Sequence, residues 1–335
     1  MPHPAFLFGF TSVLAFFGLV SPLVAALPSV DRSLAARTPS LPLKVNIVHT
    51  FDFPSWCENL AVQANGRILV SRLDTPEVIQ IDPTGVLAPI TVATFNATTY
   101  KGCLGISETA AGLFYVITSA QVDDAFVKTS GINSVWQINM NAFSVDSTGN
   151  VLTPATVTKL VDIPDADFLN GMTILDNSNI LVGDIYNGWV YKISTVTGAY
   201  NIVINDPLMK FPPSAGTNLG VNGLKIKDSH LYWTNTANGT FNRIQINSAA
   251  QPIGRSQIVS ANVPKADDFI FKSDGTAFIA ANQADDLSAL LPGQSVATVV
   301  AGSPTSTILA GVTAGKFGRL STDCDRLYLT TSGGE

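Results

Sequence analysis

One pattern recurs six times along the chain: a short apolar strand, a tight turn and a second apolar strand. It is visible in ENLAV…GRILV, CLGI…GLFYV, NGMTI…NILV, NGLKI…HLYW, DDFIF…GTAFI and FGRL…RLYL. The repeats begin at Glu58, Cys103, Asn170, Asn222, Asp267 and Phe317, which lie 45, 67, 52, 45 and 50 positions apart. Such a period is typical of one blade of a β-propeller. Because the apolar face of each blade is buried only by its neighbour, the ring has to close. The sequence therefore predicts an all-β fold, a six-bladed β-propeller with four-stranded blades.

A third strand follows several of these pairs, as VIQID, VWQIN, VYKI and FNRI. No stretch with helical periodicity separates the strands, which excludes a parallel βαβ fold. The strand expected at residues 43–51 would supply the outer strand of the last blade and close the ring. The propeller is accordingly predicted to span residues 43–335.

The N-terminus is almost wholly apolar from Ala5 to Val24 and ends in two alanines. This pattern predicts a signal peptide over residues 1–26, cleaved after Ala26 and followed by a disordered leader over residues 27–42. The alternative is a membrane anchor, which Pro22 and the small residues behind it disfavour. Secretion would expose two N-x-Thr sequons, at Asn96 and Asn238, to glycosylation. We therefore expect a secreted glycoprotein.

Charge and hydropathy exclude some classes of binding partner, and the cysteine count limits the possible disulfides. Only 13% of residues are charged and the net charge is −6, so no basic surface is expected to bind nucleic acid. After the signal peptide no apolar run is long enough to span a bilayer, and a closed ring with few exposed edges favours a monomer. Of the three cysteines at most one pair forms, and Cys57 with Cys103 is the favoured pair because both fall at equivalent repeat positions.

The residues that open the inner strands are expected to meet at one rim of the central channel. Four of them carry side-chain oxygens: Glu58, Asn170, Asn222 and Asp267. Such oxygens either hold Ca²⁺ or form a polar floor for a buried ligand. In the alternative interpretation they only hydrogen-bond the turn that enters each strand.

Aromatic residues near these positions predict an apolar pocket for a small molecule. The expected lining residues are Trp56, Phe168, Trp233, Phe269 and Phe317. Packing between the blades is the alternative role for each of them. An insertion at Ser119–Ser134 lies between two strands on the same rim and is either a lid over the pocket or a disordered surface loop.

The phrases WCENLAV…GRILVS, FLNGMTIL, GVNGLKI…LYWTNT, ADDF…DGTAFIA and KFGR…RLYLTTSGG resemble a family of secreted fungal propellers. That family includes the hetero-Diels–Alderases of tropolone–sesquiterpene biosynthesis and distantly resembles the gluconolactonase and paraoxonase-like enzymes. The resemblance extends from about Leu43 to Gly334. It implies a secondary-metabolite enzyme that dehydrates a hydroxylated precursor to a quinone methide and adds it across an alkene of a terpene.

In that interpretation Glu58 and Asp267 are the candidate acid and base, while Asn170 and Asn222 donate hydrogen bonds to the quinone-methide oxygen. The resemblance to the hydrolases implies an alternative, a Ca²⁺-dependent lactonase or esterase in which the same four residues hold the ion and Asp268 is the nearest base. A paraoxonase-like histidine dyad is not expected, because after the signal peptide only His49 and His230 remain, and no zinc or nucleotide motif is present. A third alternative is a non-catalytic secreted binding propeller.

Overall fold

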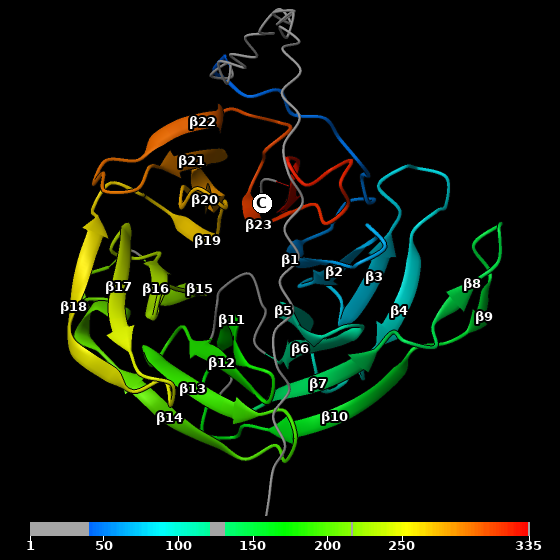
Figure 1. Ribbon diagram of the computed structural model, residues 1–335, viewed down its shortest axis with the longest axis horizontal. Coiled ribbons are helices and arrows are strands. Elements are labelled where there is room, and N and C mark those ends of the chain that lie inside the picture. Colours follow the sequence, from blue (N-terminus) through cyan, green and yellow to red (C-terminus); the bar gives the residue numbers. More distant parts are fainter. Residues whose placement is uncertain (1–39, 121–130, 216, 334–335) are drawn as a thin grey trace, which may run out of the picture. The chain divides into compact units, whose positions relative to one another are not determined.

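The strands of the chain form a ring of antiparallel sheets. The computed structural model describes residues 40–120, 131–215 and 217–333. In Figure 1 the blades follow one another around a common centre, with the first strand of each blade on the inside. Neighbouring inner strands contact one another in sequence, and the last inner strand contacts the first. The chain is therefore an all-β propeller, as the repeat predicted.

Five of the sheets are four-stranded blades. Blade 1 contains β1 (Cys57–Val62), β2 (Ile68–Arg72), β3 (Glu77–Ile81) and β4 (Ile90–Thr94); blade 2 contains β5 (Gly102–Ala110), β6 (Leu113–Ser119), β7 (Asn133–Asn139) and β10 (Thr156–Asp162). Blade 3 contains β11 (Leu169–Asp176), β12 (Asn179–Asp184), β13 (Trp189–Ser194) and β14 (Tyr200–Asn205). Blade 4 contains β15 (Val221–Lys227), β16 (His230–Asn235), β17 (Thr240–Ile246) and β18 (Pro252–Ser260); blade 5 contains β19 (Ala266–Phe271), β20 (Ala277–Ala281), β21 (Asp286–Leu290) and β22 (Thr298–Gly302).

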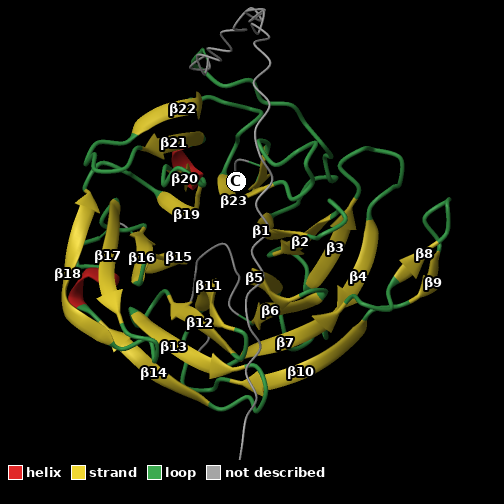
Figure 2. Ribbon diagram, in the orientation of Figure 1, coloured by secondary structure: helices red, strands yellow, loops and turns green. Residues whose placement is uncertain are grey.

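Few other elements interrupt this plan. A small hairpin of β8 (Ser144–Val145) and β9 (Val151–Thr153) extends from blade 2 between β7 and β10. Figure 2 shows the two short 3₁₀ helices of the described residues, η1 (Pro207–Met209) and η2 (Asn282–Ala284). Among the described residues, no helix has both the length and the apolar character needed to cross a bilayer.

The sixth repeat differs from the other five. It forms a two-stranded sheet of β23 (Val312–Phe317) and β24 (Leu327–Thr331), where a four-stranded blade was expected. The expected closing strand at residues 43–51 is not formed either, since these residues have no regular strand structure. Instead the Leu43 N–H donates to Val300 O of β22 at 2.7 Å, and Leu43 and Val45 pack against the apolar cluster that blade 5 forms with Leu309 and Val312. Side-chain packing covers this side of the ring where a strand ladder was predicted.

Apolar clusters between neighbouring blades form the core. One of them joins blades 1 and 2 through Phe95, Phe114 and Cys103, which has no exposed surface. Cys57 instead packs against a different cluster, beside the sixth repeat. The predicted Cys57–Cys103 disulfide is therefore wrong: these two residues and Cys324 are all free thiols.

The signal peptide, most of the predicted leader and most of the expected lid lie outside the described residues. Both sequons lie within them, and the side chains of Asn96 and Asn238 are exposed. Secretion and glycosylation stay predictions.

Candidate functional site

Each inner strand begins with an irregularity in its pairing with the second strand. Cys57 pairs with Arg72, but the next paired residue, Asn59, lies opposite Ser71, so Glu58 is the extra residue of a β-bulge. Equivalent irregularities occur near the starts of the other five inner strands. A regular strand would point these side chains between neighbouring blades, and a bulge of this kind redirects them. The bulges therefore explain how an apolar strand presents a polar residue to the channel.

The pairing register corrects two of the six predicted positions. Residues equivalent to Glu58 are Asn170, Asn222 and Asp267, as expected, but the equivalent in blade 2 is Leu104 and in the sixth repeat Thr313. Local sequence similarity places Cys103 one residue before its equivalent position and Phe317 four residues after it, at the last residue of β23. The ring of side-chain oxygens thus continues into the sixth repeat as a threonine hydroxyl, which donates to Cys57 O at 2.7 Å.

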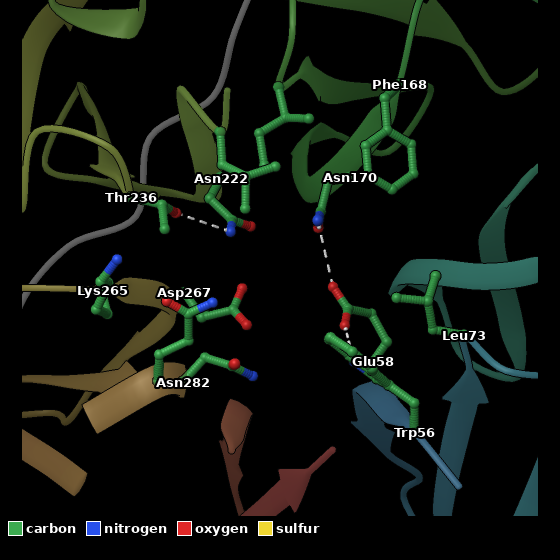
Figure 3. A pocket seen from close by; sticks show the side chains of 13 residues that line it. Trp56, Glu58, Leu73, Phe168, Asn170, Asn222, Thr236, Lys265, Asp267 and Asn282 are labelled. Atoms are coloured by element: carbon green, nitrogen blue, oxygen red, sulfur yellow. Dashed lines mark hydrogen bonds between the residues drawn. The ribbon is translucent and has the colours of Figure 1, made fainter. Parts of the chain in front are cut away.

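The four predicted polar residues line one pocket. Figure 3 shows Glu58 and Asn170 facing Asn222 and Asp267 across this hollow, which has about 520 Å³ of space not filled by atoms, including its open mouth. Its lining residues are Trp56, Glu58, Leu73, Phe168, Asn170, Ile185, Leu219, Asn222, Thr236, Lys265, Asp267, Asn282 and Gln283. The structure therefore brings together residues from four separate repeats.

Sequence reasoning missed one group of lining residues that share a structural position. They follow directly after the second strand of a blade: Leu73 after β2, Ile185 after β12, Thr236 after β16 and Asn282 after β20. Because the first two strands of a blade are antiparallel, the end of the second lies beside the start of the first. The sequence repeat could have predicted these positions, because the alignment that locates the inner strands also locates the end of the second strand of each blade.

Glu58 is buried, and both of its carboxyl oxygens accept hydrogen bonds. Trp56 Nε1 donates to Oε2 at 2.7 Å and Asn170 Nδ2 donates to Oε1 at 3.2 Å. Burial raises the pKa of Glu58 to about 7, the two hydrogen bonds oppose this rise, and the charge of Asp268 adds to it. Glu58 is therefore poised between its protonated and ionised forms near neutral pH.

The Asp267 carboxyl accepts fewer hydrogen bonds that could offset its burial than the Glu58 carboxyl does. Burial raises the pKa of its carboxyl well above the ordinary range, and the neighbouring carboxyls of Glu58 and Asp268 raise it further. Only a hydrogen bond from Asn222 opposes these effects. Two carboxyls that share a site cannot both ionise easily, and the one with fewer donors keeps its proton.

Below this pair lies an ionic layer that does not line the pocket. The Asp268 carboxylate accepts from Lys225 Nζ at 2.6 Å and from Asn59 Nδ2 at 3.1 Å. Burial alone would raise the pKa of Asp268, but Lys225 and Lys316 hold it below its usual value. Asp268 does not line the pocket and its carboxylate is paired with Lys225, so this geometry does not favour it as a base for hydrolysis.

The predicted aromatic lining is found in part. Trp56 and Phe168 line the pocket, and the ring of Phe168 packs against that of Tyr186 with centroids 5.4 Å apart. Three others are elsewhere: Trp233 is fully buried with its Nε1 donating to Leu208 O, Phe269 packs at 4.7 Å on Phe241, and Phe317 packs on Phe278. Their side chains belong to the packing between and beside the blades, the alternative role that the sequence left open.

The Asn-Gly pairs of blades 3 and 4 have two separate functions in this geometry. The asparagines face the pocket, while the glycines allow neighbouring inner strands to approach. A Cβ atom at Gly171 would lie 2.0 Å from Asn222 O, and one at Gly223 would lie 2.3 Å from an Asp268 carboxyl oxygen. A side chain at either position would push apart the strands that form the pocket floor.

The pocket can be tested for the calcium site that the hydrolase resemblance implies. Asn222 Oδ1 is buried and has no hydrogen-bond partner among the described residues, and it lies in the same ring as two carboxyls and a second carboxamide. These are the hard oxygen donors that Ca²⁺ takes, so the four residues fit the ion. Within the described residues, however, no group of three or more histidine, cysteine or acidic side chains is placed to hold a metal. Neither His49 nor His230 lines the pocket.

Fold and pocket together define a β-propeller with a small, partly apolar pocket at the centre of its ring. No protein-family model matches the sequence. The chain is similar to two curated fungal proteins: one of Phoma sp, named "Putative hetero-Diels-Alderase", is 28% identical and the alignment covers 93% of this chain and 94% of the relative. The other, "Putative hetero-Diels-Alderase asR5" of Sarocladium schorii, is 27% identical over 86% of this chain and 78% of the relative. The predicted resemblance to hetero-Diels–Alderases is confirmed by these two relatives.

Solved structures resemble the fold alone. A luciferin-regenerating enzyme superimposes with a TM-score of 0.59 at 13% identity, covering 84% of this chain and 85% of its own. At such identity the likeness confirms the propeller and carries no information about the reaction.

Proposed function

We propose that this protein is a hetero-Diels–Alderase-like pericyclase of secondary metabolism, which dehydrates a phenolic alcohol to a quinone methide and directs its cycloaddition with an alkene. One observation carries the proposal: two carboxyls with different hydrogen-bond environments, Glu58 and Asp267, converge on a pocket with an apolar wall. The names of the two curated relatives support the same reaction class.

The different environments support one division of the acid and base roles. Asp267 keeps its proton because burial and two neighbouring carboxyls raise its pKa, so it is the acid. Glu58 accepts two hydrogen bonds that stabilise its ionised form, and its pKa of about 7 suits a base at neutral pH. Pairs of carboxyls whose pKa values are driven apart commonly divide acid and base roles in this way.

The elimination balances with these two residues. Glu58 takes the phenol O–H proton, the oxygen electrons form the new C=O, and the π electrons shift through the ring to the benzylic carbon. There the C–OH bond breaks and the leaving oxygen takes the proton of Asp267, which releases water and the quinone methide. Proton transfer through water afterwards returns Glu58 and Asp267 to their starting forms.

The cycloaddition needs orientation and little further chemistry. The C=C–C=O unit of the quinone methide adds to the alkene and forms one C–C and one C–O bond. Trp56, Phe168 and Leu219 offer an apolar wall on which the alkene would lie. Holding both partners in a near-attack arrangement is worth roughly 7–11 kcal/mol in favourable cases. Asn170 uses one amide N–H on Glu58, and its second can donate to the quinone-methide oxygen.

The test is to incubate the purified protein with 2-(hydroxymethyl)phenol and a cyclic trisubstituted alkene, and to separate the enantiomers of the adduct by chiral chromatography. We expect faster formation than in buffer and an excess of one enantiomer. Glu77→Gln, on β3 and outside the pocket, is a matched control for Glu58→Gln. A racemic adduct formed at the buffer rate across a panel of such phenols and alkenes would overturn the proposal and favour a binding propeller without catalysis.

The unpartnered Asn222 Oδ1 favours a second candidate, a Ca²⁺-dependent lactonase or esterase. Glu58, Asn170, Asn222 and Asp267 would hold the ion, which would supply a Lewis acid for an ester carbonyl. Calorimetric titration of Ca²⁺ into EDTA-treated protein separates the candidates. One-site binding that is lost in Glu58→Gln and Asp267→Asn would favour the hydrolase, whereas no binding heat would remove it.

A further inference from the structure

Apart from Glu58 and Asn170, the pocket wall is divided into an apolar and a polar arc. Apolar residues come from blade 1, blade 3 and the segment before β15: Trp56, Leu73, Phe168, Ile185 and Leu219. The remaining polar residues come from blades 4 and 5: Asn222, Thr236, Lys265, Asp267, Asn282 and Gln283. Figure 3 shows Lys265, Asn282 and Asp267 on one side of the pocket and Trp56, Leu73 and Glu58 on the other. A ligand that matches this wall has a hydrocarbon part and an oxygenated part at opposite ends.

Lys265 is the single basic residue among the described residues that line the pocket. Its side chain makes no ion pair or hydrogen bond to any described residue. Lys225, in contrast, is paired with the Asp268 carboxylate. The charge at the pocket mouth is therefore available to a ligand.

The backbone at Lys265 is strained. Ala266 N–H donates to Val263 O at 3.2 Å, which closes a turn with Pro264 second and Lys265 third. Lys265 has φ of 58°, in the left-handed region, where the third position of such a turn ordinarily takes Gly or Asn. Strain of this kind persists where surrounding structure enforces it, and it concentrates at ligand sites.

Blade 3 provides an internal comparison. Its corresponding turn, Ile163-Pro164-Asp165-Ala166, is closed by the equivalent hydrogen bond, from Ala166 N–H to Ile163 O at 3.2 Å. Asp165 at its third position is not among the residues with positive φ. The Pro turn by itself therefore does not force the left-handed conformation that Lys265 adopts.

We infer that Lys265 is a specificity-determining residue that binds a second, ionised oxygen of the substrate, a phenolate or enolate, across the unsaturated ring from the hydroxyl whose proton Glu58 takes. This inference rests on the proposed function for the identity of the substrate, and it adds the ionic form in which the molecule is held. Lys265 fixes the oxygenated end at blade 5, while the apolar arc holds the hydrocarbon end. The ring then lies across the floor, between Glu58 and Asp267.

A coloured probe tests this directly, because 4-nitrophenol is yellow only as the phenolate. At one fixed pH near neutrality, the wild-type protein should increase the phenolate absorbance on binding. Lys265→Gln should weaken phenolate binding by about tenfold or more, the effect of losing one charge-assisted contact. Lys265→Arg, which keeps the charge, should retain most of the binding.

Two controls make the result specific. Lys272→Gln, at an exposed lysine just beyond β19, should bind the probe as wild type does. The neutral ether 4-nitroanisole should bind wild type and Lys265→Gln equally, because only the apolar arc holds it. Equal phenolate binding by wild type and Lys265→Gln, or no binding to wild type, would overturn the inference.

The experiments distinguish failure of the proposed function from failure of the inference about Lys265. Lys265-dependent phenolate binding without any cycloaddition would retain the anion site and reject the pericyclase. An enantiomeric excess that Lys265→Gln leaves unchanged, with unchanged phenolate binding, would retain the pericyclase and reject Lys265.

Discussion

The two ends of one strand, β19, have opposite roles. Its first half, Ala266–Asp268, carries the bulge that directs Asp267 into the pocket and Asp268 onto Lys225. Its second half begins at Phe269, which is fully buried and packs on Phe241 and Phe271. The same six residues thus serve the site at one end and the core at the other. Changes at the first half should alter chemistry, and changes at the second half should alter stability.

The largest effect is expected from Asp267→Asn. The amide has nearly the same shape but cannot donate a carboxyl proton, so turnover of the phenolic alcohol should fall by about 10²–10⁴-fold. Melting temperature should change little, because the native carboxyl is already neutral. Asp274→Asn, at an exposed turn of the same blade, is the control and should leave both quantities unchanged. Undiminished turnover would remove Asp267 as the acid.

Phe269→Ala tests the other half of the strand. Removing this buried ring should lower the free energy of unfolding by about 3–5 kcal/mol, measured by urea denaturation. The enantiomeric excess formed by the remaining folded protein should stay at the wild-type value, since Phe269 does not line the pocket. Phe53→Ala is the control, because Phe53 is 80% exposed. A changed enantiomeric excess would show that Phe269 does influence the pocket.

The pH dependence of the free energy of unfolding tests the raised pKa of Glu58. Its native pKa of about 7 lies above the ordinary value of 4.5, so between these pH values the native state binds more protons than the unfolded state. Stability should therefore fall as pH rises from about 4.5 to 7, by on the order of 3 kcal/mol from this residue. Urea denaturation in EDTA should show the slope, and Glu58→Gln should reduce it and leave the part that Asp267 contributes. An undiminished slope in the variant would assign it to other groups.

A smaller effect is expected from Gly171→Ala. The new methyl group would meet the backbone oxygen of Asn222, and the displacement should destabilise the protein by about 1–3 kcal/mol. Gly183→Ala, whose added Cβ would lie 3.3 Å from the end of the Leu224 side chain, should cost less. Differential scanning calorimetry of both variants compares a glycine of the pocket floor with one behind it. Equal stability would show that the floor strands can separate freely.

Much of the fold could be predicted because its information is local. Alternating apolar residues and Gly turns specify short strands, and the period of the repeat specifies how often a new blade starts. The sixth repeat was harder, because a hairpin covered by an irregular segment has the same local pattern as the first half of a complete blade. Leu43 and Val45 read as a strand in sequence, yet they are held by packing and one hydrogen bond.

The polar half of the site was also predictable, since Glu58, Asn170, Asn222 and Asp267 stand at equivalent repeat positions. The aromatic half was predicted less well, because Phe269 lies two residues after Asp267 and Trp233 lies near the end of β16, yet both pack between blades. Along a strand one residue separates the two faces, and a bulge reverses the alternation. Adjacency in sequence could not distinguish Phe168 in the pocket from Phe269 in the core.

By itself the sequence determined the repeat, the strands and the set of polar residues that open them, because each depends on interactions within one hairpin. The tertiary structure decided which side chains share the pocket, which carboxyl has fewer donors and where Lys265 stands. Those properties depend on contacts between blades whose residues, such as Glu58 and Asp267, are far apart in the sequence. Burial and charge act through space, independently of distance along the chain.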